Sequence, residues 1–244
     1  RDLVRSRGLG DVYKRQNMCR PLELVFSNGM DKGVRIGPAT GNVEDMTTFE
    51  QFYDAYKKQM DYAIQLLVNA DNAIDMAHAE RCPLPFLSSM VDDCMKVGKT
   101  VQEGGAVYNF TGPQGFGVAN MADSLYSVKT LVYDEKKITM GELKEALATN
   151  YGKGLGAEDV AAMTAKIANE LKEAGKTIGE KEVAAILNTV VAASEAPEVK
   201  ANGERILKLI EEVPKFGNDI SEVDAFARDV AYTYTAVSYT HLTL

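Results

Sequence analysis

The residues with the clearest chemical potential lie in residues 103–117, where five glycines bracket a short apolar and aromatic run. The polar side chains on this segment are Asn109, Thr111 and Gln114. Glycine permits positive φ and lets another molecule approach closely, so such a turn can present backbone N–H groups to a ligand. The spacing is not the G-x-G-x-x-G of dinucleotide sites, and no Gly-Lys-Ser/Thr follows for a phosphate loop. A nucleotide site is therefore disfavoured.

Histidine and cysteine chemistry is nearly excluded by the small number of these residues. The two histidines, His78 and His241, give little basis for a Ser-His-Asp triad or a histidine metal site. We interpret His78 as a partly exposed or capping residue at a helix end. The three cysteines, at positions 19, 82 and 94, suit neither a disulfide framework nor paired zinc ligands. They indicate a reducing cytosol, and we expect no bound metal.

The elements that position the glycine segment are predicted to be one strand and one helix. The apolar run over residues 106–110 predicts a strand that enters the glycine turn, and a helical pattern follows over residues 119–133. Upstream, the pattern predicts a long helix over residues 47–77, opened by a capping box between Thr47 and Glu50. Its aromatic-rich apolar face is interpreted as core, because that spacing is what a packed helix requires.

Shorter elements are predicted on either side of this unit. The first is a helix that ends at Asn28-Gly29, followed by a short strand at residues 34–36. Another helix is predicted over residues 86–97, closed by Gly98. A further helix is predicted to start at a capping box formed by Thr139 and Glu142.

Composition narrows the class of protein. The chain of 244 residues has a net charge of −8 and a pI near 5.0, which argues against a nucleic-acid backbone as partner, since phosphate contacts need clustered Lys and Arg. No apolar run is long enough to span a bilayer, and the N-terminus lacks the pattern of a signal peptide. We therefore expect a cytoplasmic protein with no membrane or nucleic-acid partner.

Both ends of the chain look foreign to the rest. Residues 1–16 are basic on an acidic chain and show no sustained period, while residues 237–244 are rich in Ser, Thr and Tyr without capping or packing logic. We interpret both as translated sequencing-adapter sequence, a non-native leader and tail. The alternative is a pair of natural flexible termini.

Four blocks around the glycine segment resemble the glycyl radical enzyme superfamily, which contains pyruvate formate-lyase and the radical diol dehydratases. They are, in order along the chain, Gly104-Gly105, Tyr108-Asn109-Phe110, Gln114-Gly115-Phe116-Gly117 and Ala122-Asp123-Ser124-Leu125. The stretch Gly37-Pro38-Ala39-Thr40-Gly41 is similar to a Gly-Pro-x-Thr-Gly stretch of the same family. The blocks match the dehydratase and C–N or C–S lyase branch in particular.

The resemblance implies a fold and an activity for a longer protein. The fold would be α/β, with this chain an internal, predominantly helical fragment of a ten-stranded barrel. The intact enzyme would use a thiyl radical to abstract hydrogen from a small hydroxylated substrate and then eliminate water, an amine or sulfite. A separate activating enzyme with S-adenosylmethionine and a 4Fe-4S cluster would install the glycyl radical, so the protein would bind no cofactor directly and would need anaerobic conditions. A homodimer is expected for the full-length protein.

The resemblance also indicates which functional residues are missing. The family's reactive cysteine lies in Gly-Cys-x-Glu, but Cys19 is followed by Arg20-Pro21, so we interpret Cys19 as a core thiol. The Arg-Val-x-Gly-Tyr motif around the radical glycine is absent as well. No catalytic residue is therefore expected in this chain, which should be inactive alone. Asn109, Thr111 and Gln114 are the candidates to face the substrate cavity; alternatively they only hydrogen-bond the turn or a neighbouring loop.

The predicted domain organisation follows from the same comparison of motifs. Residues 17–152 are assigned to a partial pyruvate formate-lyase-type barrel domain and residues 203–236 to its continuation, which includes Pro214-Lys215-Phe216-Gly217-Asn218-Asp219. Residues 153–202, rich in Ala, Glu, Lys and Val, are interpreted as a helical insertion. Two alternatives stay open for function: pyruvate formate-lyase proper, or a helical binding or scaffold module whose glycine turn grips an anion or a partner backbone.

Overall fold

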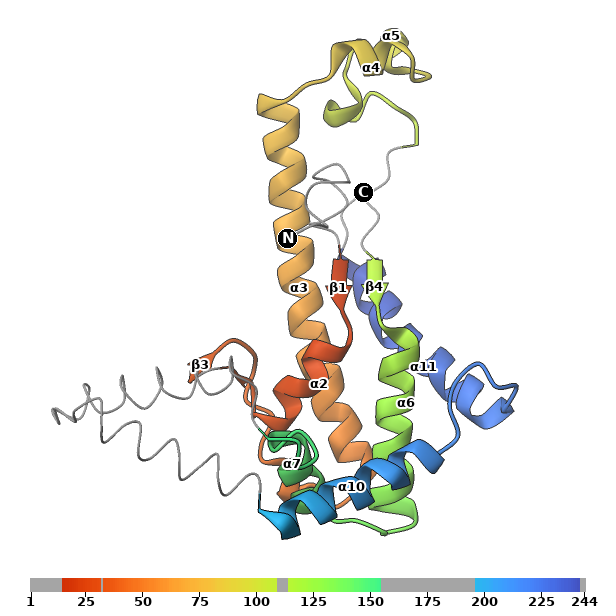
Figure 1. Ribbon diagram of the computed structural model, residues 1–244. Helices are drawn as coiled ribbons and strands as arrows, with labels where there is room; N and C mark the ends of the chain where they lie inside the picture. The colour runs from red at the N-terminus through yellow and green to blue at the C-terminus, as the bar shows by residue number, and fades with distance from the viewer. Residues whose placement is uncertain (1–14, 32, 109–113, 155–195, 242–244) are drawn as a thin grey trace, which may run out of the picture.

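The computed structural model describes residues 15–31, 33–108, 114–154 and 196–241, and within this part of the chain helices predominate (Figure 1). The elements, in chain order, are β1 (Arg15–Asn17), α2 (Cys19–Phe26), β2 (Met30–Asp31), β3 (Val34–Arg35), the 3-10 turn η1 (Val43–Asp45), α3 (Phe49–Arg81), α4 (Pro85–Ser89), α5 (Cys94–Val97), the 3-10 turn η2 (Val101–Glu103), β4 (Gln114–Phe116), α6 (Val118–Val128), the π-helical segment η3 (Lys129–Asp134), α7 (Met140–Ala148), α10 (Pro197–Glu212) and α11 (Ser221–His241).

The strands β1 and β4 form a parallel pair although they lie far apart in the sequence. Arg15 pairs with Gln114 and Asn17 with Phe116, and the N–H of Met18 donates to the carbonyl of Phe116 at 2.9 Å. Each strand is followed directly by a helix, α2 or α6, and both strands run the same way beside α3 (Figure 1). This repeated strand-helix order is typical of α/β architecture. The described residues contain only this pair and the small β2–β3 hairpin, not a ten-stranded barrel.

The predicted strand over residues 106–110 is wrong for the residues that are described. Residues 106–108 form bends, and Val107 and Tyr108 are 67% and 79% exposed. The chain turns sharply just before them, because Gly105 lies against residue 99: an added Cβ would come within 2.1 Å of the Lys99 carbonyl oxygen. The strand forms later, within Gln114–Phe116, where β1 supplies a pairing partner.

Helix α3 confirms the long helix predicted from the apolar period. Its large buried side chains include Phe52, Tyr56, Met60 and Ile64, each four residues after the last, as on one face of a helix. The capping box is displaced by one residue from the prediction. Thr48, not Thr47, is the N-cap, and Gln51 supplies the reciprocal side chain. Glutamine serves this purpose as well as glutamate, so the pair Thr48 and Gln51 forms the box in place of Thr47 and Glu50.

The core lies where α2, α6 and α11 pack on the first half of α3. Aromatic rings from several helices meet there: Phe49 lies 6.0 Å from both Tyr133 and Phe226, and Tyr126 lies 5.8 Å from Phe226 between ring centroids. Rings at these separations and tilts attract one another beyond their burial. The aromatic face of α3 is therefore core, as interpreted from the sequence.

Beyond Asp71, helix α3 has no buried residue and carries α4 and α5 at its far end (Figure 1). The single helix predicted over residues 86–97 is wrong, because the chain breaks between α4 and α5 at Asp93, whose φ of 73° is left-handed. The predicted end at Gly98 is confirmed by its φ of 71°.

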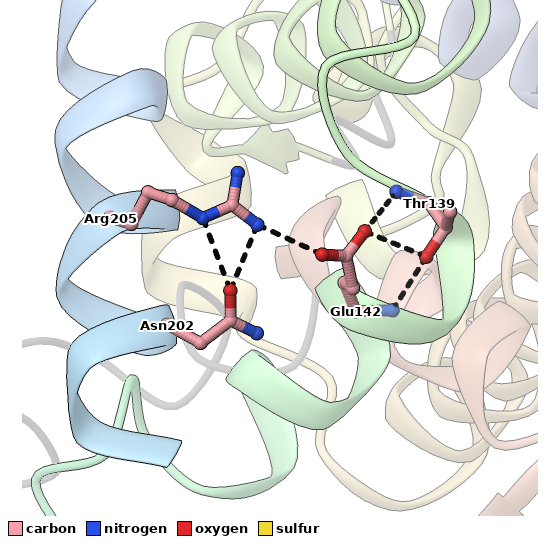
Figure 2. A network of polar contacts seen from close by, with 4 residues as sticks. All are labelled: Thr139, Glu142, Asn202 and Arg205. Carbon is pink, nitrogen blue, oxygen red and sulfur yellow. Dashed lines mark hydrogen bonds and ion pairs between the residues drawn. The ribbon is translucent and has the colours of Figure 1, made fainter. Parts of the chain in front are cut away.

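Helices α7 and α10 are joined by a polar network that Figure 2 shows from close by. Thr139 and Glu142 form the predicted capping box, in which Glu142 accepts from the Thr139 N–H at 2.7 Å. The other carboxylate oxygen of Glu142 accepts from Arg205 of α10 at 2.9 Å, and Arg205 also donates to Asn202. A capping box that was readable in the sequence thus also anchors a distant helix.

Candidate functional site

The glycine segment and strand β1 define the candidate site. Of the three predicted cavity residues, Gln114 is the first residue of β4 and is exposed, whereas Asn109 and Thr111 lie outside the described residues. Gln114 is paired in register with Arg15 of the neighbouring strand. Its amide offers one acceptor and two donor hydrogens, a set that can bind a hydroxyl group.

The glycines after Gln114 are required by close contacts rather than by ligand approach alone. A Cβ at Gly115 would lie 3.1 Å from Tyr234 and 3.2 Å from the Met18 sulfur. Gly117 has φ +85°, and a Cβ there would lie 3.2 Å from Cys19 Sγ. These glycines let α11 and the start of α2 pack directly on β4.

Cys19 lies beside the turn but lacks the features of a reactive thiol. Its backbone N–H donates to Asn17 Oδ1 at 3.0 Å, and its Sγ is 3.9 Å from the Gly117 carbonyl oxygen. Burial and then the nearby charge of Glu23 raise the pKa of the thiol, so it stays protonated near neutral pH. The structure supports a packed thiol, in line with the interpretation from the sequence.

Three buried polar side chains lie behind β1 and β4, and the sequence did not predict this arrangement. Tyr56 donates to the Met18 carbonyl at 3.4 Å, and its pKa is strongly raised, chiefly by burial. Tyr234 of α11 is 6% exposed, and burial followed by the charge of Asp71 raises its pKa to about 12. Asp71 itself is fully buried on α3. The sequence feature that could have indicated a buried Asp71 is its position three residues after Val68, on the apolar face of α3.

Two of the matched motifs hold each other in place. Asp123, in the Ala-Asp-Ser-Leu block of α6, accepts the N–H of Phe216 at 2.8 Å. Lys215, one residue earlier, donates to the Val213 carbonyl at 2.7 Å and also to that of Ile210, near the end of α10. Burial lowers the pKa of Lys215. These motif residues therefore act as structural contacts between α6, α10 and the following loop.

The Gly-Pro-x-Thr-Gly stretch is likewise structural. Asn28 Oδ1 accepts the N–H groups of Thr40 at 2.8 Å and Gly41 at 2.9 Å. Gln59 of α3 is 1% exposed and donates to the Pro38 carbonyl at 2.7 Å. Gln59 was not predicted as a structural contact from the sequence. The feature that could have indicated it is that a polar residue stands on the otherwise apolar, buried face of α3.

In the described ranges, no group of three or more His, Cys, Asp and Glu residues could hold a metal ion. Across the same parts of the chain, no helix is both long and apolar enough to cross a membrane.

The chain belongs to the pyruvate formate lyase-like family, whose model matches residues 9–242. Its relatives include dehydratases and glycyl radical subunits, as expected from the four blocks around the glycine segment.

Among these relatives, trans-4-hydroxy-L-proline dehydratase of Clostridioides difficile is 37% identical over 137 residues, covering 55% of this chain and 17% of that protein. A solved structure concerned with 1,2-propanediol dehydration in Roseburia inulinivorans is 55% identical, with a TM-score of 0.85 over 91% of this chain and 27% of that chain. The B12-independent glycerol dehydratase of Clostridium butyricum is 42% identical, with a TM-score of 0.69 over 91% of this chain and 22% of that chain. The chain therefore spans about a sixth to a quarter of the length of these proteins.

Proposed function

We propose that this chain is part of a glycyl radical enzyme that dehydrates a small hydroxylated substrate, or eliminates an amine or sulfite from one. The single observation that carries the proposal is the 55% identity, over 91% of the chain, to the structure concerned with 1,2-propanediol dehydration. Relatives named for hydroxyproline, sulfopropanediol and isethionate support the wider substrate class, since all three compounds bear a hydroxyl group. A small diol is the substrate we propose first.

In the complete enzyme, a thiyl radical would take a hydrogen atom from the hydroxyl-bearing carbon. Loss of the neighbouring hydroxyl as water and return of a hydrogen atom would give the carbonyl product, so the reaction is redox neutral. We propose that the radical cysteine and glycine lie outside this chain, which is therefore inactive alone. The partners would be the substrate, a radical S-adenosylmethionine activating enzyme and a second subunit in a homodimer, in an anaerobic cytoplasm.

Within this chain, we propose that Gln114, with Asn109 and Thr111, faces the substrate. The exposed amide at the start of β4 can donate to and accept from a substrate hydroxyl. In the complete enzyme, Gln114→Ala is expected to lower kcat/KM roughly three- to tenfold, the loss of one neutral hydrogen bond. Gln65→Ala is the matched control: the Gln65 amide on α3 donates to Asp61, and its loss should leave kcat/KM unchanged.

We also propose that residues 153–202 are an insertion into the barrel domain. Gly152 and Lys200 are in direct contact: an added Cβ at Gly152 would lie 2.4 Å from Lys200 Cα. A Cβ at Gly203 would lie 2.4 Å from the Tyr151 backbone. The chain therefore leaves and returns at nearly the same point, which is the geometry an insertion requires.

The test is to express the complete reading frame anaerobically with its activating enzyme and to measure the glycyl radical by electron paramagnetic resonance. We expect a radical signal and turnover of at least one member of a panel of 1,2-propanediol, glycerol, trans-4-hydroxyproline and isethionate. Turnover of pyruvate with coenzyme A instead would favour pyruvate formate-lyase proper. Absence of any radical, together with a compact monomeric chain, would favour the binding-module alternative.

A further inference from the structure

The end of α3 that lies farthest from the core carries residues 84–105, which we call the cap. The cap contains α4, α5 and η2, and Figure 1 shows it at the upper end of α3, beyond the start of β1 and β4. Six of its large apolar side chains are exposed, and we call them the cap surface: Leu84, Phe86, Leu87, Met90, Met95 and Val97. Phe86 is 80% exposed and Met95 is 75% exposed. Exposed apolar side chains gathered in this way are typical of an interaction surface.

The cap has no apolar core of its own. Its buried residues are Ser88, Cys94 and Gly105, and none of them has a large apolar side chain. Helices α4 and α5 have five and four residues. Helices this short are marginal in water, and in proteins they are stabilised by packing an apolar face against another element. The described residues supply no such packing for the cap surface.

Hydrogen bonds define the shape of the cap instead. The Ser88 hydroxyl donates to the Leu84 carbonyl at 2.7 Å and accepts the N–H of Val101 at 3.0 Å. Gln102 Oε1 accepts the N–H of Leu84 at 3.2 Å. Each of these bonds replaces a bond to water, so its net contribution to stability is modest. The bonds hold the chain in one path, but they remove none of the cap surface from water.

The length of the similar proteins indicates what covers this surface. The structure concerned with 1,2-propanediol dehydration matches 91% of this chain with 27% of its own, so most of that polypeptide lies outside the match. The strand pair needs further polypeptide as well, because two parallel strands of three residues are too few for a stable sheet. The cap lies beyond the start of both strands, so segments that extend the sheet come next to it (Figure 1). A segment of the same polypeptide also has a high effective concentration, which a second copy lacks.

We propose that the cap surface is an internal interface, on which another segment of the same, longer polypeptide packs with an apolar face. The inference rests on the proposed function only in taking this chain as part of a longer enzyme, and it does not depend on the radical chemistry. The six side chains carry no charge, so a charged segment would lose its hydration there without gaining a partner. Because the cap ends at Gly105, inside the glycine segment, this packing also anchors the segment that leads to Gln114.

The experiment uses the complete reading frame, expressed without its activating enzyme. Phe86→p-benzoylphenylalanine places a photo-cross-linking ring at an exposed aromatic position of α4, and peptide mass spectrometry identifies what it reaches. Mixing copies with ordinary and heavy nitrogen separates links within one polypeptide from links between copies. Lys96→p-benzoylphenylalanine, at an exposed charged residue of α5, is the matched control. Peroxide oxidation of Met95 in the unaltered enzyme gives a second measurement that needs no variant.

We expect Phe86→p-benzoylphenylalanine to link to residues of the same polypeptide outside this chain, in at least fivefold higher yield than the Lys96 control. Met95 should be oxidised at least tenfold more slowly than in the enzyme unfolded in urea. Links between copies, equal yields from the two positions, or oxidation of Met95 at the unfolded rate would overturn the proposal. Links within one polypeptide in an enzyme that forms no radical would contradict the proposed function alone. A radical together with links between copies would contradict the cap interface alone.

Discussion

Replacing Gly115 by alanine tests the packing that holds the glycine segment in place. The new Cβ would lie 3.1 Å from Tyr234 Cγ and 3.2 Å from the Met18 sulfur, both shorter than the 3.5 to 4.0 Å of an ordinary contact. Overpacking of this kind lowers the free energy of unfolding by about 1–3 kcal/mol. Alanine also restricts the unfolded chain more than glycine does, which raises the free energy of unfolding by about 0.5–1 kcal/mol. The difference between these ranges is a net loss of about 0–2.5 kcal/mol in the free energy of unfolding, centred near 1 kcal/mol.

The matched control is the same substitution at Gly141. In α7 an added Cβ would meet only the Thr139 hydroxyl, at 4.0 Å, so Gly141→Ala should stabilise by about 0.5–1 kcal/mol. Urea unfolding followed by circular dichroism measures both, and the midpoints should shift in opposite directions at similar slopes. In a Tyr234→Leu background, the penalty of Gly115→Ala should fall by about 1 kcal/mol. A stabilising Gly115→Ala, or a penalty that did not change in the Tyr234→Leu background, would refute the reasoning.

Three further predictions concern contacts away from the strand pair. Gly37→Ala places a Cβ 2.3 Å from Gln59 Oε1, so it should lower the free energy of unfolding, measured in urea, by about 1–3 kcal/mol. The loss should be clearly smaller in a Gln59→Ala background, and equal losses in the two backgrounds would contradict the contact. The pKa of Glu142 is lowered, first by the Thr139 N–H and hydroxyl and then by Arg205. The stability advantage of the wild type over Glu142→Gln should therefore be present at pH 7 and vanish as the pH falls through that lowered pKa. A stability advantage that grew in acid would contradict this reasoning. Replacing residues 155–195 by a short Gly-Ser linker should leave the thermal midpoint nearly unchanged if residues 153–202 are an insertion, whereas loss of the folded state would contradict that proposal.

Elements with local signals could be predicted from the sequence. The capping box of Thr139 and Glu142, the helix end at Gly98 and the apolar period of α3 each depend on residues within a few positions of one another. The cap at Thr48 differs from the predicted Thr47 by one residue, because two adjacent threonines are followed, three residues on, by Glu50 and Gln51, and either pair can form a capping box. Local sequence features therefore predict the approximate position of a helix more accurately than they predict its first residue.

Contacts between distant segments could not be predicted in the same way. Strand β4 is three residues long and has no period of its own, so its position depends on pairing with β1. The apolar run before it was a more regular strand pattern, yet residues 106–108 form bends in the described structure, and Val107 and Tyr108 are exposed. The family motifs were recognisable, but only the structure shows that Asp123 binds the Phe216 backbone and that Tyr234 packs on Gly115.

The measurement that tests the central claim most directly is the genomic DNA sequence on both sides of the region coding residues 17–236. If the chain is part of a glycyl radical enzyme, the reading frame should continue in both directions, with Gly-Cys-x-Glu just upstream and Arg-Val-x-Gly-Tyr downstream. A reading frame that carries neither motif would contradict the proposed radical chemistry and leave the binding-module alternative.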